Sequence, residues 1–178
     1  MKNLFLFLLI AACCLPACKK GENDPFLSLR SRDARLTGKW ILTDLTSESQ
    51  FYGDSASFYP KFYGMSFNGS VMTRTYSDTD TSYTRSYVYS QEMTIYKDDT
   101  LTWIQVDENG SYEDSLTWTW QDENKKKVLI LNYDLYVVDR LTNKELVLKY
   151  DDYYRNTNET TGYWSEDAYS GTRTYKKD

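Results

Sequence analysis

The sequence predicts an all-β protein, an antiparallel up-and-down β-barrel of about eight to nine strands. The chain contains 17 Tyr and 5 Trp among 178 residues, and aromatic residues favour strands. From residue 36 onward, short β-prone runs alternate with polar turn clusters, without a sustained apolar stripe of helical period. Closing such a meander into a barrel also removes exposed strand edges.

Nine segments are predicted as strands, separated by polar connectors. The two longest, 63–76 and 83–96, can each contain a bulge. Asn109-Gly110 is the strongest hairpin signal, because a two-residue primed turn needs positive φ at both central residues. The predicted strands are residues 39–45, 63–76, 83–96, 100–107, 112–121, 127–133, 135–141, 145–150 and 170–176.

Alternation assigns the faces of the strand 112–121. Leu116, Trp118 and Trp120 fall on one side, and Thr117 and Thr119 fall on the other. Successive side chains of a strand point to opposite faces, so one face is predicted to be buried and the other wet.

The following apolar segments lack this alternation. Residues 128–131, together with Leu135, Val137 and Val138, are apolar on both faces. Such a pattern is typical of strands that are covered on both sides. We therefore expect the barrel interior on one side and another segment on the other.

The N-terminal residues are typical of an export signal. Lys2 provides the positive region, and residues 4–15 form an apolar run, which is shorter than the roughly 20 residues that a membrane-spanning helix needs. Leu-Pro-Ala-Cys at 15–18 resembles the bacterial lipobox, which implies diacylation of Cys18 and cleavage before it. The alternative is an ordinary secretory signal with an incidental cysteine. The predicted organisation is a signal peptide (1–17), a lipid anchor and tether (18–35), and a barrel (36–178).

Cysteine usage and charge restrict the remaining possibilities. Cys13 and Cys14 leave with the signal and Cys18 carries lipid, so no disulfide framework is expected. The formal net charge is −5, and acidic and basic residues are mixed along the chain. Because nucleic-acid binding needs a concentrated positive surface, no nucleic-acid partner is expected.

The segment Leu36-Thr37-Gly38-Lys39-Trp40 resembles the Gly-x-Trp signature of lipocalins, with Gly38 and Trp40 at the matching positions. The pattern of segments from 93 to 148 is similar to the lipocalin-like domains of envelope lipoproteins, and the resemblance covers residues 36–176. It implies an eight-stranded barrel with Trp40 at its closed end. It also implies that an Arg of the last strand packs across the Trp40 ring in a cation–π contact. Arg173 is the first candidate for this Arg, and Arg140 is the second.

Catalysis is not expected. The chain contains no histidine, which excludes Ser-His-Asp and Cys-His mechanisms, and it lacks a Ser-x-x-Lys motif and a Gly-rich phosphate loop. Carboxylates remain the only plausible catalysts, which makes a carboxylate-dependent hydrolase a third hypothesis. Adjacent carboxylates fall mostly at turns, however, where they are typically solvated. Residues 78–82 and 107–111 resemble calcium loops but lack the EF-hand Gly and Glu. No metal and no cofactor are expected.

Abundant aromatic residues point to binding. One set, Trp103, Trp118 and Trp120, is expected to reach the lumen of the barrel and either contact a small apolar or amphipathic ligand or fill the lumen. A second set crowds around a polar loop and could stack on sugar rings or simply cover the barrel rim. The second set comprises Tyr150, Tyr153, Tyr154, Tyr163, Trp164 and Tyr169, of which Tyr153, Tyr154, Tyr163 and Trp164 are the candidate binding residues.

These observations lead to a main hypothesis and a rival. The main hypothesis is a monomeric, lipid-anchored, non-catalytic barrel that binds a small ligand or acts as an interaction module. The rival is a surface glycan-binding lipoprotein. Lys19 follows Cys18 where an inner-membrane retention signal would have Asp, so outer-membrane placement is expected, with the side of the membrane left open.

Overall fold

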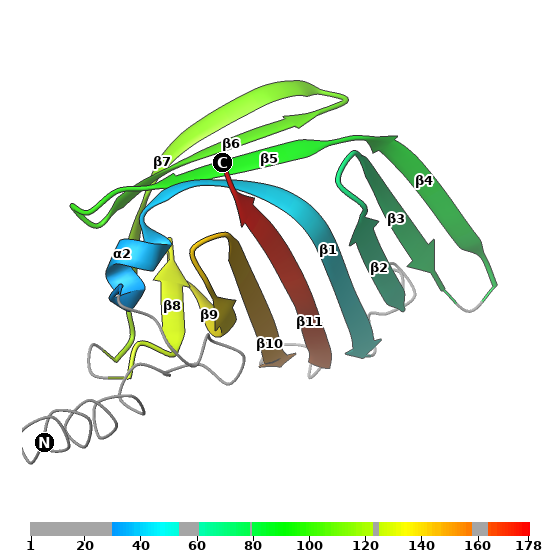
Figure 1. Cartoon of the computed structure of the whole chain (residues 1–178). Coiled ribbons are helices and arrows are strands. Elements are labelled where there is room, and N and C mark those ends of the chain that lie inside the picture. Colours follow the sequence, from blue (N-terminus) through cyan, green and yellow to red (C-terminus); the bar gives the residue numbers. More distant parts are fainter. Residues whose placement is uncertain (1–29, 54–60, 79, 123–124, 158–163) are drawn as a thin grey trace, which may run out of the picture.

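The computed structural model describes residues 30–53, 61–78, 80–122, 125–157 and 164–178. In this part of the chain, one short helix and one continuous antiparallel sheet make up the fold (Figure 1). The elements are α2 (Arg32–Leu36), β1 (Gly38–Gly53), β2 (Phe62–Phe67), β3 (Val71–Ser77), β4 (Ser82–Val88), β5 (Ser90–Ile95), β6 (Thr100–Asp107), β7 (Gly110–Trp120), β8 (Val128–Leu131), β9 (Asp134–Leu141), β10 (Glu145–Thr157) and β11 (Trp164–Lys177).

The sheet closes into a barrel, which confirms the predicted fold class. Strands β1 and β5–β11 form an eight-stranded closed ring, because β1 pairs with β5 at one edge and with β11 at the other. In Figure 1, β5, β6 and β7 pass over the wall formed by β8–β11 and β1. All the strand pairs are antiparallel, as a meander requires.

Strand β1 belongs to the barrel and to a side sheet. Its first residues pair with β5, from Gly38 opposite Ile95, whereas its later residues pair with β2, from Leu45 opposite Phe67. Strands β2, β3 and β4 therefore branch away from the barrel as a three-stranded extension. The predicted meander in plain sequence order lacks this branch.

The predicted strand 63–76 is a hairpin rather than one bulged strand. It turns at Asn68-Gly69, where Gly69 has φ of 94° and the Asn68 side chain accepts a hydrogen bond from the Val71 amide at 3.0 Å. Gly tolerates positive φ without steric cost. The signal is the same Asn-Gly dipeptide that indicates the turn at 109–110.

The predicted strand 83–96 is divided at Tyr89. Its first part, β4, ends the side sheet, and its second part, β5, joins the barrel wall. The Tyr89 amide donates to the Ser70 carbonyl, and its buried ring lies 5.4 Å from the Phe67 ring, centroid to centroid. Tyr89 thus anchors the chain where it leaves one sheet for the other.

Alternation along β7 is confirmed. Trp118 and Trp120 are buried, and Thr117 and Thr119 are exposed. The hairpin at Asn109-Gly110 also forms, although only Gly110 has positive φ. The turn is therefore not the predicted two-residue primed type.

The prediction that β8 and β9 are covered on both faces is wrong. Leu129, Leu131 and Val138 are buried, but Leu135 and Val137 are 53% and 52% exposed. Their side chains alternate between the lumen and the outer surface like those of the other strands. The apolar residues on the outer face of β8 and β9 are therefore not covered by a further segment of the described chain.

Helix α2 packs at one end of the barrel, and all of it except Leu36 falls in the range predicted as tether. Ser31 caps it by accepting a hydrogen bond from the Ala34 amide at 3.1 Å, as N-cap serines do. Leu36 and Arg35 are buried, and the Arg35 guanidinium donates to the Leu141 carbonyl at 2.5 Å. The helix therefore closes this end, which is called the closed end below.

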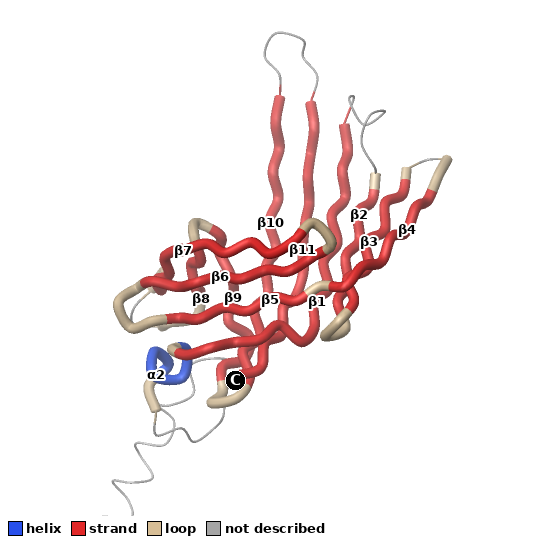
Figure 2. The backbone as a smooth tube through the Cα atoms, turned by 90° about the horizontal axis from the view of Figure 1, so that it is seen from above, coloured by secondary structure: helices blue, strands red, loops and turns tan. Residues whose placement is uncertain are grey.

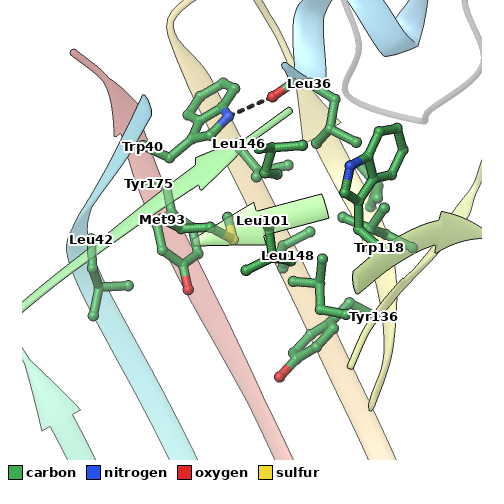
Figure 3. Close-up of a cluster of buried hydrophobic side chains, with 14 of the residues drawn as sticks. Leu36, Trp40, Leu42, Met93, Leu101, Trp118, Tyr136, Leu146, Leu148 and Tyr175 are labelled. Atoms are coloured by element: carbon green, nitrogen blue, oxygen red, sulfur yellow. Dashed lines mark hydrogen bonds between the residues drawn. The ribbon is translucent and has the colours of Figure 1, made fainter. Parts of the chain in front are cut away.

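The core fills the lumen at the closed end. In Figure 3, the Trp40 indole donates a hydrogen bond to the Leu36 carbonyl, at 2.6 Å. Beside it lie side chains of β1, β5, β6, β10 and β11. Those that are at most 2% exposed include Leu42, Met93, Leu101, Leu146, Leu148 and Tyr175.

The predicted contact between Arg173 and Trp40 is wrong. The register places Lys177 opposite Trp40 and Arg173 opposite Leu45. The Lys177 Nζ lies 4.9 Å from the Trp40 ring centroid, whereas Arg173 stacks on other aromatic rings. Arg140, the second candidate, pairs instead with Glu145 at 2.8 Å.

The opposite end of the barrel is open on one side. Strand β9 pairs with β10 only between Leu146 and Lys149, and the rest of β10 pairs only with β11. Figure 2 shows the β10–β11 pair extending well beyond the β5–β7 layer. The lumen is therefore accessible along this projecting pair.

Candidate functional site

The candidate site is a cavity at the open end, with a volume of about 590 Å³. Strands β1, β9, β10 and β11 supply most of its wall, and β2 supplies Tyr63. Its lining residues are Ser47, Ser49, Tyr63, Tyr133, Asp134, Leu135, Tyr136, Tyr150, Asp151, Asp152, Asp167, Tyr169 and Arg173. We call it the open-end cavity.

Strand register explains why these residues line one space. Ser47 pairs with Gly171, and Gly171 also pairs with Tyr150. Directly paired residues of antiparallel strands share a face. Ser47, Tyr150 and Gly171 therefore lie in one row of the inner surface, next to the row that contains Arg173.

Arg173 lies at the inner end of the open-end cavity, among aromatic rings. Its guanidinium carbon is 5.7 Å from the Trp103 ring centroid, 5.4 Å from that of Tyr136 and 5.6 Å from that of Tyr150. We call these three rings the Arg173 cage. A cation within about 6 Å of a ring centroid is attracted by the ring quadrupole.

A buried polar network lies beneath the Arg173 cage. Gln91 donates to the Tyr175 hydroxyl at 2.7 Å, and the Tyr89 hydroxyl donates to the Gln91 side-chain oxygen at 2.9 Å. Burial raises the pKa of the Tyr89 and Tyr175 phenols, while the nearby charge of Arg173 opposes that rise. These phenols therefore stay protonated and serve as hydrogen-bonding groups beside a permanent cation.

Tyr136 connects the Arg173 cage to the cavity wall. Its ring meets the Tyr150 ring edge to face, with centroids 5.8 Å apart. Burial raises its pKa to about 12, and the charge of Arg173 again opposes the shift. Tyr150 in turn passes over Gly171, where an added Cβ would lie only 2.4 Å from the Tyr150 hydroxyl oxygen. The absence of a side chain at Gly171 thus makes room for this ring.

The outer part of the open-end cavity carries carboxylates. The Tyr169 hydroxyl donates to Asp152 at 2.9 Å, and Asp167 lies on the same inner face, opposite Tyr154. Asp134 begins β9, next to Tyr133, a residue that is 90% exposed. The cavity therefore has a cation at its inner end and acidic groups around its entrance.

The predicted lumen residues take different positions. Trp103 contributes to the Arg173 cage. Trp118 and Trp120 pack at the closed end, where their indoles donate to the Tyr96 carbonyl at 2.8 Å and to Asp33 at 2.7 Å. Only Trp103 of the three therefore lies beside the open-end cavity.

The predicted rim cluster is divided between two faces. Tyr153 pairs with Ala168 on the outer face, whereas Tyr154 pairs with Asp167 on the inner face, and their exposures are 58% and 57%. Trp164 lies 5.7 Å below the guanidinium of Arg155. Tyr163 lies outside the described residues. Tyr150 and Tyr169, of the same cluster, line the open-end cavity. The described members of the cluster therefore do not form one continuous platform.

A second depression, of about 570 Å³, lies on the outer surface of the same strands. Its lining includes Val128, Leu135 and Val137, together with polar residues such as Thr46 and Lys149. The Lys149 ammonium is already paired with Asp139 at 2.9 Å. This depression therefore offers apolar contact without a cation free to bind a ligand.

Two further observations concern metals and membranes. Within the described ranges, no three His, Cys, Asp or Glu side chains lie close enough together to hold a metal ion. The same residues contain no helix of sufficient length and hydropathy to cross a membrane.

Comparison of the chain with protein-family models, curated proteins and solved structures finds no match in any of the three.

Proposed function

We propose that this chain is a lipid-anchored, non-catalytic, lipocalin-like envelope protein that binds a small apolar or amphipathic molecule in its barrel. The observation that carries the proposal is the open-end cavity, which lies above a lumen that is otherwise filled by side chains. Its volume of about 590 Å³ is within the range of ligand pockets, roughly 300 to 1,000 Å³.

The character of the cavity wall supports an amphipathic ligand. The rings of Tyr63, Tyr136 and Tyr150 provide apolar surface, and Arg173 and the carboxylates provide a few polar contacts. Pockets for small molecules are typically apolar with a small number of polar groups that orient the ligand. Binding without chemistry agrees with a chain that contains no histidine.

The membrane part of the proposal rests on the sequence. Leu-Pro-Ala-Cys at 15–18 resembles a lipobox, and two or three acyl chains on Cys18 would hold the protein firmly to a bilayer. Gly38 opens β1, and Trp40 is fully buried at the closed end, where the lipocalin resemblance expects it. Lys19 after Cys18, in place of the Asp of an inner-membrane retention signal, supports the outer membrane as the location. We further propose that the barrel acts as a monomer.

A neutral fluorescent probe tests the proposed binding. N-phenyl-1-naphthylamine should bind the wild-type protein with an emission increase. Ser47→Phe should weaken this binding about tenfold or more, because the new ring would occupy the cavity. Thr46→Phe is the matched control, since Thr46 lines the outer depression and not the open-end cavity. Binding that survives Ser47→Phe but is lost in Thr46→Phe would place the site on the outer surface.

Glycan binding is the alternative function. The exposed ring of Tyr153 and the partly buried ring of Trp164 favour it, because aromatic faces can stack on sugars. Titration with oligosaccharides should then be weakened by Tyr153→Ala and unaffected by Ser47→Phe. The opposite pattern would support the lumen site.

A further inference from the structure

We propose that Arg173 binds the anionic head group, a carboxylate or a phosphate monoester, of an amphipathic ligand whose tail lies in the open-end cavity. This inference rests on the proposed function and specifies its ligand. The structural basis is a guanidinium at the inner end of a cavity, surrounded by three aromatic rings.

The charge of Arg173 has no acidic partner among the residues that the structure describes. The ion pairs of the described residues do not include it. Its polar side-chain neighbour is the neutral Tyr175 hydroxyl, and its Nε is buried without a hydrogen-bond partner. Burying a charge is costly unless it is paired. The ring contacts and the Tyr175 hydroxyl offset part of that cost, and a bound anion would offset more of it.

The chemistry of the guanidinium favours oxyanions. Its planar array of N–H donors matches a carboxylate or phosphate through two parallel hydrogen bonds. The cage rings contact Arg173 while the side chain still lines the cavity. An anion entering from the cavity would therefore meet the guanidinium without having to displace another carboxylate.

The wall above Arg173 suits an apolar tail. Ser47 and Ser49 are small, and Tyr63, Tyr136 and Tyr150 supply ring surface. Tyr169 precedes Arg173 by four positions on β11, which corresponds to about 13 Å along a strand. The ligand therefore has a defined span between its head group and the entrance.

Carboxylates at the cavity entrance restrict the charge of the ligand's other end. Asp152 and Asp167 line the cavity there, and like charges in proximity are unfavourable. A second anionic group at the far end would be repelled, whereas a methyl, hydroxyl or ammonium end would not. The structure thus points to a molecule with a single anionic end.

Calorimetric titration of the protein with dodecanoate, dodecyl phosphate and dodecanol tests the head-group preference. At least one of the two anions should bind about tenfold or more tightly than dodecanol, the effect expected of hydrogen bonds to a charged group. Comparing dodecanoate with dodecyl phosphate then shows which oxyanion the site prefers. Equal affinity for dodecanol and both anions would overturn the anion site and leave lumen binding intact, whereas binding of none would overturn both proposals.

Variants assign the preference to Arg173. Arg173→Gln should reduce the preference for the anion to about twofold or less, and Arg173→Lys should retain part of it, because the charge remains. Arg140→Gln is the matched control, since Arg140 pairs with Glu145 outside the cavity. Circular dichroism establishes that each variant is folded. An anion preference that persists in folded Arg173→Gln would overturn the assignment.

A dicarboxylate tests the role of the entrance. Dodecanedioate should bind several-fold more weakly than dodecanoate, and the double change Asp152→Asn, Asp167→Asn should bring the two affinities together. Equal affinities in the wild-type protein would overturn the single-anion rule.

Discussion

Lys177 lies over the Trp40 ring, with its Nζ 4.9 Å from the ring centroid, and the same ammonium donates to the carbonyls of Arg35 and Thr37 at 2.7 and 2.6 Å. One side chain of the last strand therefore joins the first strand to the end of α2. Because those carbonyls are at the C-terminal end of the helix, a cation there is favourable. The closed end is stabilised by a lysine, although the lipocalin resemblance implied an arginine.

This relationship predicts a coupling between Lys177 and Trp40. Trp40→Ala should lower the free energy of unfolding by about 3 to 5 kcal/mol, because a fully buried ring is lost. Lys177→Met should lower it by about 1 to 3 kcal/mol, through the lost hydrogen bonds and ring contact. Denaturant unfolding measures both values. Lys176→Met, at an exposed neighbouring position, is the control.

A double-mutant cycle separates the two candidate partners of Trp40. The Trp40–Lys177 pair should show a coupling of about 0.5 to 2 kcal/mol. The Trp40–Arg173 pair should be additive within about 0.5 kcal/mol. Coupling to Arg173 and not to Lys177 would contradict the register between β1 and β11.

Gly171→Ala should destabilise the protein by about 1 to 3 kcal/mol, as overpacking does. A Cβ there would lie 2.4 Å from the Tyr150 hydroxyl oxygen and 2.5 Å from the backbone oxygen of Thr46. The phenol can move, but the Thr46 oxygen belongs to a neighbouring strand. Ser170→Ala, on the exposed face of β11, should change the free energy of unfolding by less than about 0.5 kcal/mol. Chemical denaturation that finds Gly171→Ala as stable as the wild type would contradict this packing.

Alkaline pH should destabilise the barrel through Tyr136. Burial raises its pKa from 10.0 to about 12 in the folded protein. The unfolded chain therefore loses this proton near pH 10 while the folded protein keeps it, so stability is complete below pH 10 and declines as the pH rises toward 12. Tyr136 contributes about 2 to 3 kcal/mol to the decline, at 1.36 kcal/mol per pKa unit.

Urea unfolding between pH 9 and 12 measures this effect. Tyr136→Phe should show a shallower decline than the wild type, because Phe has no proton to lose. Tyr133→Phe, at a highly exposed ring, should follow the wild-type curve. Identical pH profiles for wild type and Tyr136→Phe would exclude Tyr136 as a source of the decline.

Cys18→Ala should release the protein from membranes without altering its stability. The proposed acyl chains depend on this cysteine, and the described barrel does not include it. Fractionation of cells measures attachment, and denaturant unfolding measures stability. A variant that remains fully membrane-bound would contradict lipid anchoring through Cys18.

Local patterns in the sequence predicted most of the barrel. Alternation of Leu116, Trp118 and Trp120 assigned the buried face of β7, and Asn109-Gly110 marked its hairpin, since both signals depend on neighbouring residues. Asn68-Gly69 offered the same signal inside a segment that reads as one strand. Pairing of β1 with both β2 and β5 was not predictable, because register depends on contacts between distant segments.

The candidate site was predicted less completely. Trp103 was expected to reach the lumen, and its ring centroid lies 5.7 Å from the guanidinium carbon of Arg173, which lines the open-end cavity. The position of Arg173 depends on the register of β11 against β1 and β10, which no local pattern specifies. Tyr136 and Tyr150 become neighbours only after the strands pair. The alternation of β10 was the available signal, since Tyr150 and Asp152 fall on the same face as Leu148.

The pairing of the first strand, β1, with the last strand, β11, also affects the rate at which the barrel closes during folding. The Thr43 hydroxyl donates to the Thr174 carbonyl, 131 positions away in the chain. Contacts at such separation require a large loss of chain entropy before they form, and they slow folding. Until β11 joins, β1 and β10 each present an unpaired edge, which is a template for aggregation. β11, a strand of fourteen residues, therefore covers both edges, and we expect the chain to be most prone to aggregation before β11 has paired.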